Sequence, residues 1–519
     1  MTQQTYDSIS ILDTPIFSYT TFGNEKKQGT LIGIITELWQ DNILSLDGLQ
    51  THQYQPFYCF VVQLVSMAIL NSDAKDETYA YWKQLDGASW KQHLLQLSNG
   101  IESAWNLVES DQSKPAFLQS PSAKDDTIAI TGKDYIYAPD QLDYLVTSKN
   151  HDVKMARVWK GSLESWCYAL ISTQTMSGYS GAGSTQIMRM NGGISSRCFF
   201  GVSTSLNIGQ SFIEDVYTLC TKYTQNEDNM YGLFTTPKHT LLWLPVWNGS
   251  VSLPIQEVHP FCIEICKRIR LSWHNNDIVA YTKTVKELRV DARDFCGNVA
   301  DPWLPCQIDL KKKTIKSVSL QKLDYRDIQK LFTNEYIHPI AMTKESRTNQ
   351  YLTGSVLVRG QGTTDGYHQK HILIPPTVIL TARNKPVIGQ VSKDLIDQID
   401  KGRKVLTQGL KILFDGSFDH KDSPTYEKMR DYFSGVLHRE IDTYFFQYVW
   451  DIFGLQESKA GMERIGEKQK QWRDCLCNIL EDLLKQAINS YAPLGIKGIS
   501  IVAQTENIFY SKLQEFRGV

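Results

Sequence analysis

The chain of 519 residues is 42% hydrophobic and 21% charged, which indicates a folded protein of roughly two to four domains. Its 54 basic and 56 acidic residues leave a net charge of -2, which excludes a uniformly basic nucleic-acid-binding protein, so any nucleic-acid surface must be local. No stretch approaches the about 18 apolar residues of a membrane span. The N-terminal MTQQTYDSIS lacks the basic and apolar regions of a signal peptide, so we expect a cytoplasmic protein that does not contact membranes.

The first part of the chain is predicted to mix helices and strands. Residues 1–50 contain short runs typical of β-strands, among them LIGIITELW at 31–39. Behind Pro56, apolar residues recur at helical spacing up to Leu70, so a buried helix is expected there. Further along, we expect helices at 162–177, 260–271 and 323–333, a turn-interrupted extended segment at 241–256, alternating strands over 277–320 and a strand at 351–359.

The character of the sequence changes after Pro375 and Pro376. From about Ser392 onward, four apolar stripes at helical spacing follow one another, and the second runs from Met429 to Ile452. Four long amphipathic helices pack most economically as a four-helix bundle. The predicted fold class is therefore α+β, with a large mixed α/β domain over residues 1–380 and a C-terminal four-helix bundle over residues 381–519.

The ten cysteines are scattered, and none forms a CxxC pair or a zinc-finger set. Cys262 and Cys266 lie one helical turn apart, but no second pair is spaced to complete a tetrahedral site. We therefore expect reduced, buried thiols, no metal site and no cofactor.

Familiar catalytic motifs are absent: there is no GxxxxGK[ST], GxSxG or HExxH. GAGSTQIM is glycine-rich, but the helix predicted before it argues against a dinucleotide-binding fingerprint, which follows a strand. His368 and His371 are the closest histidine pair. A nuclease would need carboxylates brought to them by the fold, and an exposed polar turn is the simpler interpretation, so no catalytic residue is predicted.

Three local clusters suit a polyanion. The first spans residues 149–160 and sets four basic residues against one acid, Asp152. The candidate phosphate contacts in it are Lys149, Lys154, Arg157 and Lys160. The last three are at helical spacing and would share one face, and a solvated surface helix is the alternative interpretation.

The second cluster is the glycine-rich segment 178–197, GYSGAGSTQIMRMNGGISSR. It lies in a window from Ser165 to Ile213 that contains no acid. Glycine lets the backbone approach a ligand closely, and Arg189 and Arg197 offer planar donors that suit phosphate. The glycines that would make this approach are Gly178, Gly181 and Gly183. A tight crossing of two packed elements is the alternative.

The third cluster is 358–368, VRGQGTTDGYH, in which glycines at 360, 362 and 366 suggest a hairpin. Its tip presents Gln361, Thr363 and Thr364, whose side chains donate and accept hydrogen bonds. Such side chains can enter a DNA minor groove and read its shape. An ordinary polar hairpin is the alternative interpretation.

Taken together and in order, these motifs resemble one family. The six motifs between Pro115 and His368 are PAFLQSP, LVTSKNHDVKMAR, QTMSGYSGAGSTQIMRMNGGISSR, HPFCIEICKRIRL, DPWLPC and VRGQGTTDGYH, and THQYQPFYCFVVQL precedes them. The set is similar to CasA, the large subunit of Cascade, the type I-E CRISPR surveillance complex. The resemblance runs from about residue 29 to the end of the chain and includes the helical bundle.

The resemblance implies a non-catalytic subunit that recognises the protospacer-adjacent motif (PAM) of double-stranded target DNA and starts its unwinding. It implies as partners the crRNA-containing Cascade subunits (backbone, 5′-end-capping and small subunits) and a helicase-nuclease. The family's glycine loop falls on Gly178–Gly183, and its wedge falls on Gln361–Asp365, with Gln361 inserted beneath the PAM. The family also uses a lysine from another loop. The corresponding residues, Trp247–Ser250, hold no lysine, so Asn248 would make a different contact.

Two other functions stay open at this point. One is an enzyme that acts on nucleic acid through His368 or His371. The other is a structural assembly protein in which the glycine segment only packs. Cleavage by the isolated chain would favour the first, and target binding that is indifferent to Gly181 and Gln361 would favour the second.

Overall fold

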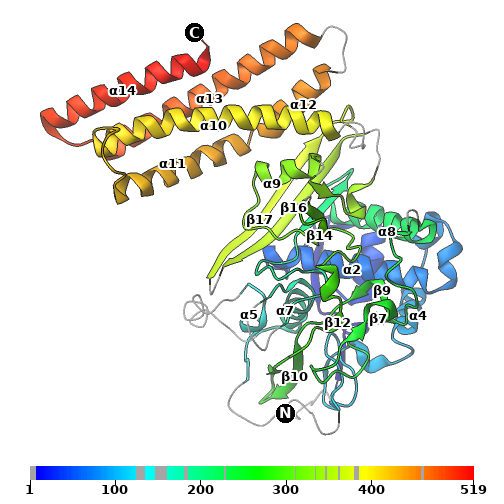
Figure 1. Ribbon diagram of the computed structural model, residues 1–519. Helices are drawn as coiled ribbons and strands as arrows, with labels where there is room; N and C mark the ends of the chain where they lie inside the picture. Colours follow the sequence, from blue (N-terminus) through cyan, green and yellow to red (C-terminus); the bar gives the residue numbers. More distant parts are fainter. Residues whose placement is uncertain are drawn as a thin grey trace. The chain divides into compact units, whose positions relative to one another are not determined.

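The structure is a computed structural model, and it describes residues 8–123, 135–145, 161–179, 185–226, 229–309, 311–333, 335–344, 348–360, 363–378, 385–456 and 461–518 (Figure 1). The chain divides into two compact units. The first consists of Met1–Leu323 and Tyr336–Leu373, and the second of Asp324–Glu335 and Ile374–Val519. The predicted boundary between residues 380 and 381 falls within 379–384, outside the described residues.

The first unit mixes short helices with short strands. Its helices are α1 (Leu31–Trp39), α2 (Tyr54–Leu70), α3 (Tyr79–Trp82), α4 (Gly87–Leu97), α5 (Pro139–Leu142), α7 (Leu163–Met176) and α8 (Ile208–Gln225). Its strands are β1 (Ser8–Ser10), β2 (Phe17–Thr21), β3 (Lys26–Gly29), β4 (Ile43–Leu46), β5 (Asn106–Glu109), β6 (Phe199–Ser203), β7 (His239–Leu241), β8 (Leu253–Pro254), β9 (Val258–Ile263), β10 (Arg268–His274), β11 (Asp277–Lys283), β12 (Val290–Asp291), β13 (Cys306–Asp309), β14 (Thr314–Ser317), β15 (Tyr336–Ile337), β16 (Gln350–Gly360) and β17 (Thr363–Ile374).

These strands form several small sheets instead of one large one. Three sheets have three strands each, in the orders β17-β16-β6, β3-β2-β4 and β14-β13-β15, and the other described strands pair as β1-β5, β7-β9, β8-β12 and β10-β11. The strands predicted over 277–320 and 351–359 are confirmed by β11 to β14 and by β16. The hairpin of β16 and β17 rises along one side of the unit in Figure 1.

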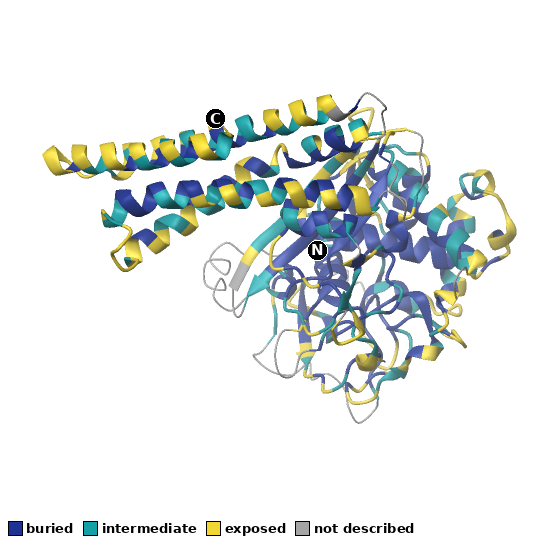
Figure 2. Ribbon diagram, turned by 45° about the horizontal axis from the view of Figure 1, so that its top comes forward, coloured by how far each residue is buried: buried dark blue, intermediate teal, exposed yellow. Residues whose placement is uncertain are grey.

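The core of the first unit is built around α2, which Figure 2 shows in the colour of buried residues. Pro56 lies in its first turn, and every residue from Gln55 to Ile69 is buried. A helix that is apolar on all sides must be surrounded by other elements, and α4, α7, α8 and β9 pack against it. The helices predicted at 56–70 and 162–177 are confirmed as α2 and α7.

Residues 31–39 form helix α1, so the strand predicted there is wrong. Thr30 caps the helix, because its Oγ1 accepts a hydrogen bond from the Gly33 amide at 3.0 Å. The buried residues at 31, 32, 34, 35, 38 and 39 follow helical spacing. The isoleucines favoured a strand, but cap and spacing outweigh their β propensity.

Residues 260–271 contribute to β9 and β10, so the helix predicted there is also wrong. Every residue of β9 is buried, and a short run buried on both faces cannot be told from a helix by periodicity. β10 pairs with β11 in antiparallel register from Arg268 opposite Lys283 to His274 opposite Asp277. The two residues between the strands, Asn275 and Asn276, have φ angles of 51° and 67°, as a tight hairpin turn requires.

The second unit is a helical bundle. Its helices are α9 (Tyr325–Gln329), α10 (Lys385–Asp415), α11 (Pro424–Asp442), α12 (Phe445–Gln456), α13 (Gly461–Tyr491) and α14 (Gly495–Arg517). The second predicted stripe is broken, because α11 ends at Asp442 and α12 begins at Phe445. Both α11 and α12 pack against α10 and α13, so they share one position of a four-helix bundle (Figure 1). The predicted α+β class with a C-terminal bundle is confirmed.

All ten cysteines are free thiols, as predicted from their scatter. Seven are buried and three are half-buried. Burial raises the pKa of the Cys262 thiol to about 12 and that of Cys266 to about 11, so both stay protonated at neutral pH.

Candidate nucleic-acid interface

Helix α7 ends directly before the glycine-rich segment and fixes where that segment begins. The Ile187 amide donates a hydrogen bond to the Ser177 carbonyl at 3.1 Å, and the Tyr179 amide donates to the Gly193 carbonyl at 2.9 Å. The first bond ties together the two ends of segment 178–186, and the second joins residues 179 and 193. We call this hydrogen-bonded base, residues 177–179 with 187–197, the stem.

Gly178 occupies a place in the stem that no larger residue could take. A Cβ at this position would lie 2.3 Å from the Gly193 carbonyl oxygen and 2.5 Å from the Ser195 carbonyl oxygen. Both are backbone atoms, so neither can rotate away. Gly178 is buried, so its close approach is to the chain itself and not to a ligand. Gly181 and Gly183 lie outside the described residues.

The third predicted cluster falls on the connection between β16 and β17. The strands are neighbours in one sheet and are joined by residues 361–362, a length typical of a β-hairpin. Thr363 and Thr364 are the first residues of β17, and Gln361 lies outside the described residues. Further down the hairpin, Thr353 Oγ1 and His371 Nδ1 are 3.0 Å apart across the two strands.

The end of β16 next to the turn is bonded to the stem. The Ser196 amide donates to the Leu357 carbonyl at 3.0 Å, and the Leu357 amide donates to Ser196 Oγ at 2.9 Å. The Arg359 amide donates to Ser195 Oγ at 3.3 Å, across 164 positions of sequence. The fold therefore brings together the second and third predicted clusters, which the sequence alone had left separate. We call this contact the junction.

Two cationic side chains lie at the junction. The Tyr144 hydroxyl donates to the Ile194 carbonyl at 2.5 Å and accepts from the Gly178 amide at 3.0 Å. The guanidinium carbon of Arg359 lies 4.4 Å from the centre of the Tyr144 ring, within cation–π range. Burial lowers the pKa of Lys267, and the charge of Arg359 lowers it further. The Asp143 carboxylate raises the pKa of Lys267 in turn, so an anion placed here would meet two cations and one nearby carboxylate.

Sequence reasoning singled out none of these residues. Arg359 and Tyr179 stand inside quoted motifs. Tyr179 belongs to the stem and is 47% exposed, and an exposed aromatic ring of this kind can stack on a base. Lys267 lies in the segment that was expected to be helical. Tyr144 carries no signal in the sequence, because only the fold brings its hydroxyl between two backbone groups.

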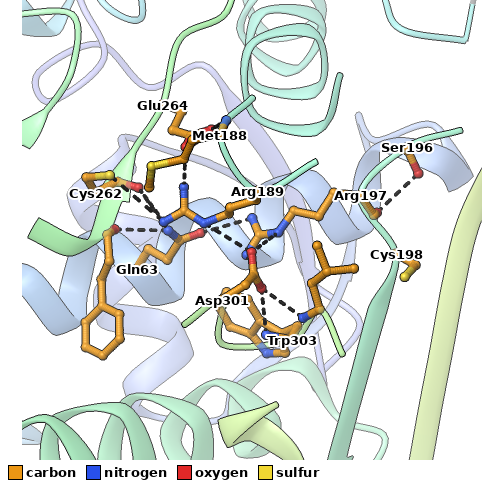
Figure 3. A network of polar contacts seen from close by, with 12 residues as sticks. Gln63, Met188, Arg189, Ser196, Arg197, Cys198, Cys262, Glu264, Asp301 and Trp303 are labelled. Atoms are coloured by element: carbon orange, nitrogen blue, oxygen red, sulfur yellow. Dashed lines mark hydrogen bonds and ion pairs between the residues drawn. The ribbon is translucent and has the colours of Figure 1, made fainter. Parts of the chain in front are cut away.

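Arg189 and Arg197 are not phosphate contacts in this structure, which corrects the prediction made for them. Arg189 is 1% exposed and Arg197 is 5% exposed. Figure 3 shows them side by side in one network of polar contacts. Asp301 accepts from Arg197 at 2.7 and 2.9 Å and lies 3.1 Å from Arg189 Nε, and Glu264 lies 2.8 Å from Arg189 Nη1.

This network pairs two guanidinium groups with two carboxyl groups, and burial raises the pKa of Glu264. Burial alone would raise the pKa of Asp301, but the two guanidinium groups hold it below its ordinary value, so the carboxylate is ionised. Gln63 Nε2 also donates to the Phe261 carbonyl at 2.9 Å, and its Oε1 lies 3.4 Å from Arg197 Nη1. The arginines therefore fasten the stem to α2 and to the buried strand β9.

Asn248 is exposed on the loop between β7 and β8. Its Oδ1 accepts a hydrogen bond from the Ser250 amide at 2.9 Å, across Gly249 with a φ of 81°. Its carbonyl accepts from Arg268 Nη1 at 3.0 Å. Because Arg268 directly follows Lys267, this loop is attached to the start of β10, next to one cation of the junction.

The remaining predicted site residues are not described. Lys149, Lys154, Arg157 and Lys160 all lie in 146–160, outside the described residues. His371 is on β17, and burial lowers its pKa. Within the described ranges, no three His, Cys, Asp or Glu side chains form a group that could hold a metal ion. None of the helices in the part of the chain that the structure describes is both long and apolar enough to cross a membrane.

No protein-family model matches the sequence, and no curated protein sequence matches it. Among solved structures, Thermobifida fusca Cse1 matches with a TM-score of 0.67 and 13% identity over 98% of both chains. CasA from Thermus thermophilus matches with a TM-score of 0.64 and 14% identity, over 98% of this chain and 99% of that one. The chain has the CasA fold.

The CasA fold covers both units, since the matches leave only a small part of the chain outside them. A chain of a CRISPR RNA-guided surveillance complex shares it with a TM-score of 0.53 and 10% identity, over 97% of this chain and 99% of that one. The resemblance expected from the six motifs is thus confirmed for the fold. At these identities the likeness establishes the CasA fold alone.

Proposed function

We propose that this chain is the large, non-catalytic subunit of a type I-E CRISPR surveillance complex and that it recognises the PAM of target DNA in the cytoplasm. The CasA fold over both units and the six motifs in their order support this proposal. In such complexes guide pairing reads the sequence, while the protein reads a short PAM and the DNA backbone. A chain with a net charge of -2 and a local cationic junction suits that task.

The observation that carries the proposal is the junction between the stem and the hairpin. A wedge that unstacks DNA works against a few kcal/mol for each base step, so it must project from a base that does not yield. Ser195 and Ser196 hold β16 close to the turn through three hydrogen bonds, and Arg189 and Arg197 anchor the same segment in the core.

In this proposal each part of the site has its own contact with the duplex. Gln361 inserts beneath the PAM, and Gly181 and Gly183 present bare backbone to the minor groove. Arg359 and Lys267 receive the sugar–phosphate backbone beside them. The further DNA contacts proposed are Asn248, Thr363, Thr364, Lys149, Lys154, Arg157 and Lys160.

The test is a complex reconstituted from this chain, a guide RNA, and the backbone, 5′-end-capping and small subunits. Binding to a matched duplex is measured with and without a PAM. We expect Gln361→Ala and Gly181→Asp each to weaken PAM-dependent binding by about tenfold or more, while binding to a pre-opened duplex is retained. Unchanged PAM dependence in both variants, with normal assembly, would favour a purely structural subunit.

Recruitment of a helicase-nuclease is the second part of the proposed role. We expect the assembled complex to recruit that enzyme only after PAM-dependent opening of the duplex. The isolated chain, incubated with duplex DNA and Mg²⁺ or Mn²⁺, should not cut it. Cleavage that disappears in His368→Ala would contradict the non-catalytic assignment and revive the nuclease hypothesis.

A further inference from the structure

A cavity of about 350 Å³ in the first unit has no part in the proposed function. It lies against one face of the β17-β16-β6 sheet, beside the start of α2 and of α8. Its volume falls within the roughly 300–1,000 Å³ typical of ligand pockets. Its lining residues come from four places in the sequence: the loop after β4, the start of α2, the region from β6 to α8, and the β16–β17 hairpin with Lys344.

The mouth of the cavity is apolar and open. Leu44 and Leu206 line it, and each is 49% exposed. Deeper in, Tyr54 and Tyr58 present rings that are nearly parallel, with an interplanar angle of 6° and centroids 6.5 Å apart. Leucines exposed at the rim of a cavity with an aromatic wall are typical of a binding surface.

The floor of the cavity is polar but carries no net charge. Lys344 forms an ion pair with Asp215 and donates to the Val202 carbonyl at 2.7 Å. The other oxygen of Asp215 accepts from the Tyr58 hydroxyl at 2.7 Å and from Trp303 Nε1 at 3.0 Å. Because the lysine is neutralised in place, the floor does not attract a phosphate.

One polar atom of the wall has no partner among the described residues. Gln55 lines the cavity and is 5% exposed, and its Oε1 is buried without a hydrogen bond. This oxygen is shielded from solvent and does not open into the cavity, so it places no demand on an occupant. The apolar mouth and aromatic wall suit an occupant that is apolar in its body.

The rim of the cavity is acidic. Ser45 and Gln50 line the cavity and donate to Asp47 Oδ1 at 2.6 Å and Asp140 Oδ1 at 2.7 Å. The hydrogen bonds from Ser45 and Thr20 hold the pKa of Asp47 below its ordinary value, so it is charged. These carboxylates disfavour nucleic acid and favour an occupant with basic flanks.

Strand β4 adds a reason to expect a polypeptide. It supplies Leu44, Ser45 and Leu46 to the cavity and is an edge strand of the β3-β2-β4 sheet. An edge strand can pair with an extended segment of another chain, whose backbone supplies hydrogen bonds and whose alternate side chains fill neighbouring pockets.

We infer that this cavity binds one uncharged apolar side chain, of leucine to tryptophan size, from an extended segment of a partner protein with basic flanking residues. This inference stands apart from the proposed function, because the cavity shares no residue with the junction. It assigns to the first unit a protein-docking site in addition to a DNA-binding one.

The test uses the full chain and fluorescein-labelled heptapeptides of the form Gly-Lys-Ala-X-Ala-Lys-Gly, with fluorescence anisotropy as the readout. We expect binding with X as Trp, Phe or Leu. With X as Ala, binding should be weaker by a factor of at least about ten. Replacing both lysines of the peptide by glutamate should weaken binding by a similar factor. Equal binding of the alanine or glutamate peptides would overturn the inference.

Variants of the chain test whether the peptide binds at this cavity. Leu206→Glu and Leu44→Glu each place a charge at the apolar mouth of the cavity. Each variant should weaken binding of the tryptophan peptide by about tenfold. Val251→Glu, at a residue 66% exposed and outside the cavity lining, is the matched control and should bind normally. Thermal unfolding checks that all three variants are folded.

Two outcomes would overturn the inference. One is peptide binding that neither Leu206→Glu nor Leu44→Glu changes, or no peptide binding at all. The other is displacement of the tryptophan peptide by single-stranded hexathymidylate, which would make the cavity a nucleic-acid site.

Discussion

Arg197 and Arg359 lie close to the same short segment, and each stacks on an aromatic ring. The guanidinium carbon lies 5.4 Å from the Trp303 ring centre for Arg197 and 4.4 Å from the Tyr144 ring centre for Arg359. Arg197 is buried and balanced by a carboxylate, whereas Arg359 is half-buried beside another cation. An arginine in a glycine-rich motif is therefore a poor candidate for anion contact where a buried carboxylate already balances its charge.

The strongest test of this difference between the two arginines is to remove Asp301, the acid that balances the charge of Arg197. Asp301→Asn leaves two buried guanidinium groups short of a partner, and breaking a buried pair costs about 3–5 kcal/mol. We expect a loss of that size in the free energy of unfolding in urea. Glu257→Gln, which removes the partner of Lys238 in an exposed pair, is the control and should cost no more than about 0.5 kcal/mol. A loss below about 1 kcal/mol for Asp301→Asn would show that the network does not anchor the stem.

Gly178→Ala tests how tightly the backbone segments of the stem pack against each other. The added methyl would collide with two carbonyl oxygens, so we expect a loss near the upper end of the roughly 1–3 kcal/mol typical of overpacking. Gly33→Ala in α1 is the matched control, because its Cβ would lie at ordinary contact distance from Thr30, and it should be neutral or stabilising. Equal stability of the two variants would contradict the close backbone packing described for the stem.

His259 tests whether the interior around Arg189 is dry. It is adjacent to Pro260, whose carbonyl accepts from Arg189, and burial lowers its pKa to about 3. Above its ordinary pKa of about 6.5 the group is neutral in both states and has no effect. Below that value the unfolded chain binds a proton that the folded chain does not, so stability falls as the pH falls, by about 2 kcal/mol at pH 5. His259→Gln should lose about 2 kcal/mol less than the wild type between pH 7.5 and 5. Identical losses would mean that the histidine is hydrated.

Arg359→Gln should give the smallest change in stability. Unlike the three preceding variants, it should act on DNA binding. We expect the stability of the chain to stay within about 0.5 kcal/mol. DNA binding by the reconstituted complex should weaken by up to about tenfold, and the slope of log affinity against log salt should fall by about 0.9. Arg293→Gln, at an exposed pair with Glu287, is the control. An unchanged salt slope, or a stability loss like that of Asp301→Asn, would place Arg359 with the structural arginines.

The helices that sequence reasoning identified correctly are those with a long, single signal. Pro56 and the unbroken apolar spacing behind it predict α2, and four apolar stripes predict the bundle. β9 and β10 were missed because a strand buried on both faces looks like a buried helix. The hairpin turn at Asn275 and Asn276 was the available signal, since asparagine tolerates positive φ.

The candidate site shows a different limit. Sequence reasoning found the glycine segment and the hairpin, but it could not see that Ser195 and Ser196 join them. It assigned Arg197 to phosphate because Asp301, its partner, is 104 residues away. Local composition reports which residue types are present, and only the fold decides which charges have already been paired.

The bond from the Ile187 amide to the Ser177 carbonyl also has a consequence for the length of the segment it closes. It fixes the distance between the ends of the nine residues 178–186 regardless of what lies between. The entropy of closing such a loop grows only with the logarithm of its length, so doubling it costs about 0.6 kcal/mol. Insertions of several residues should therefore leave the first unit folded. Under the proposed function, this makes loop length a means of extending the reach of the chain along DNA, and of changing which motif it accepts, without rebuilding the domain.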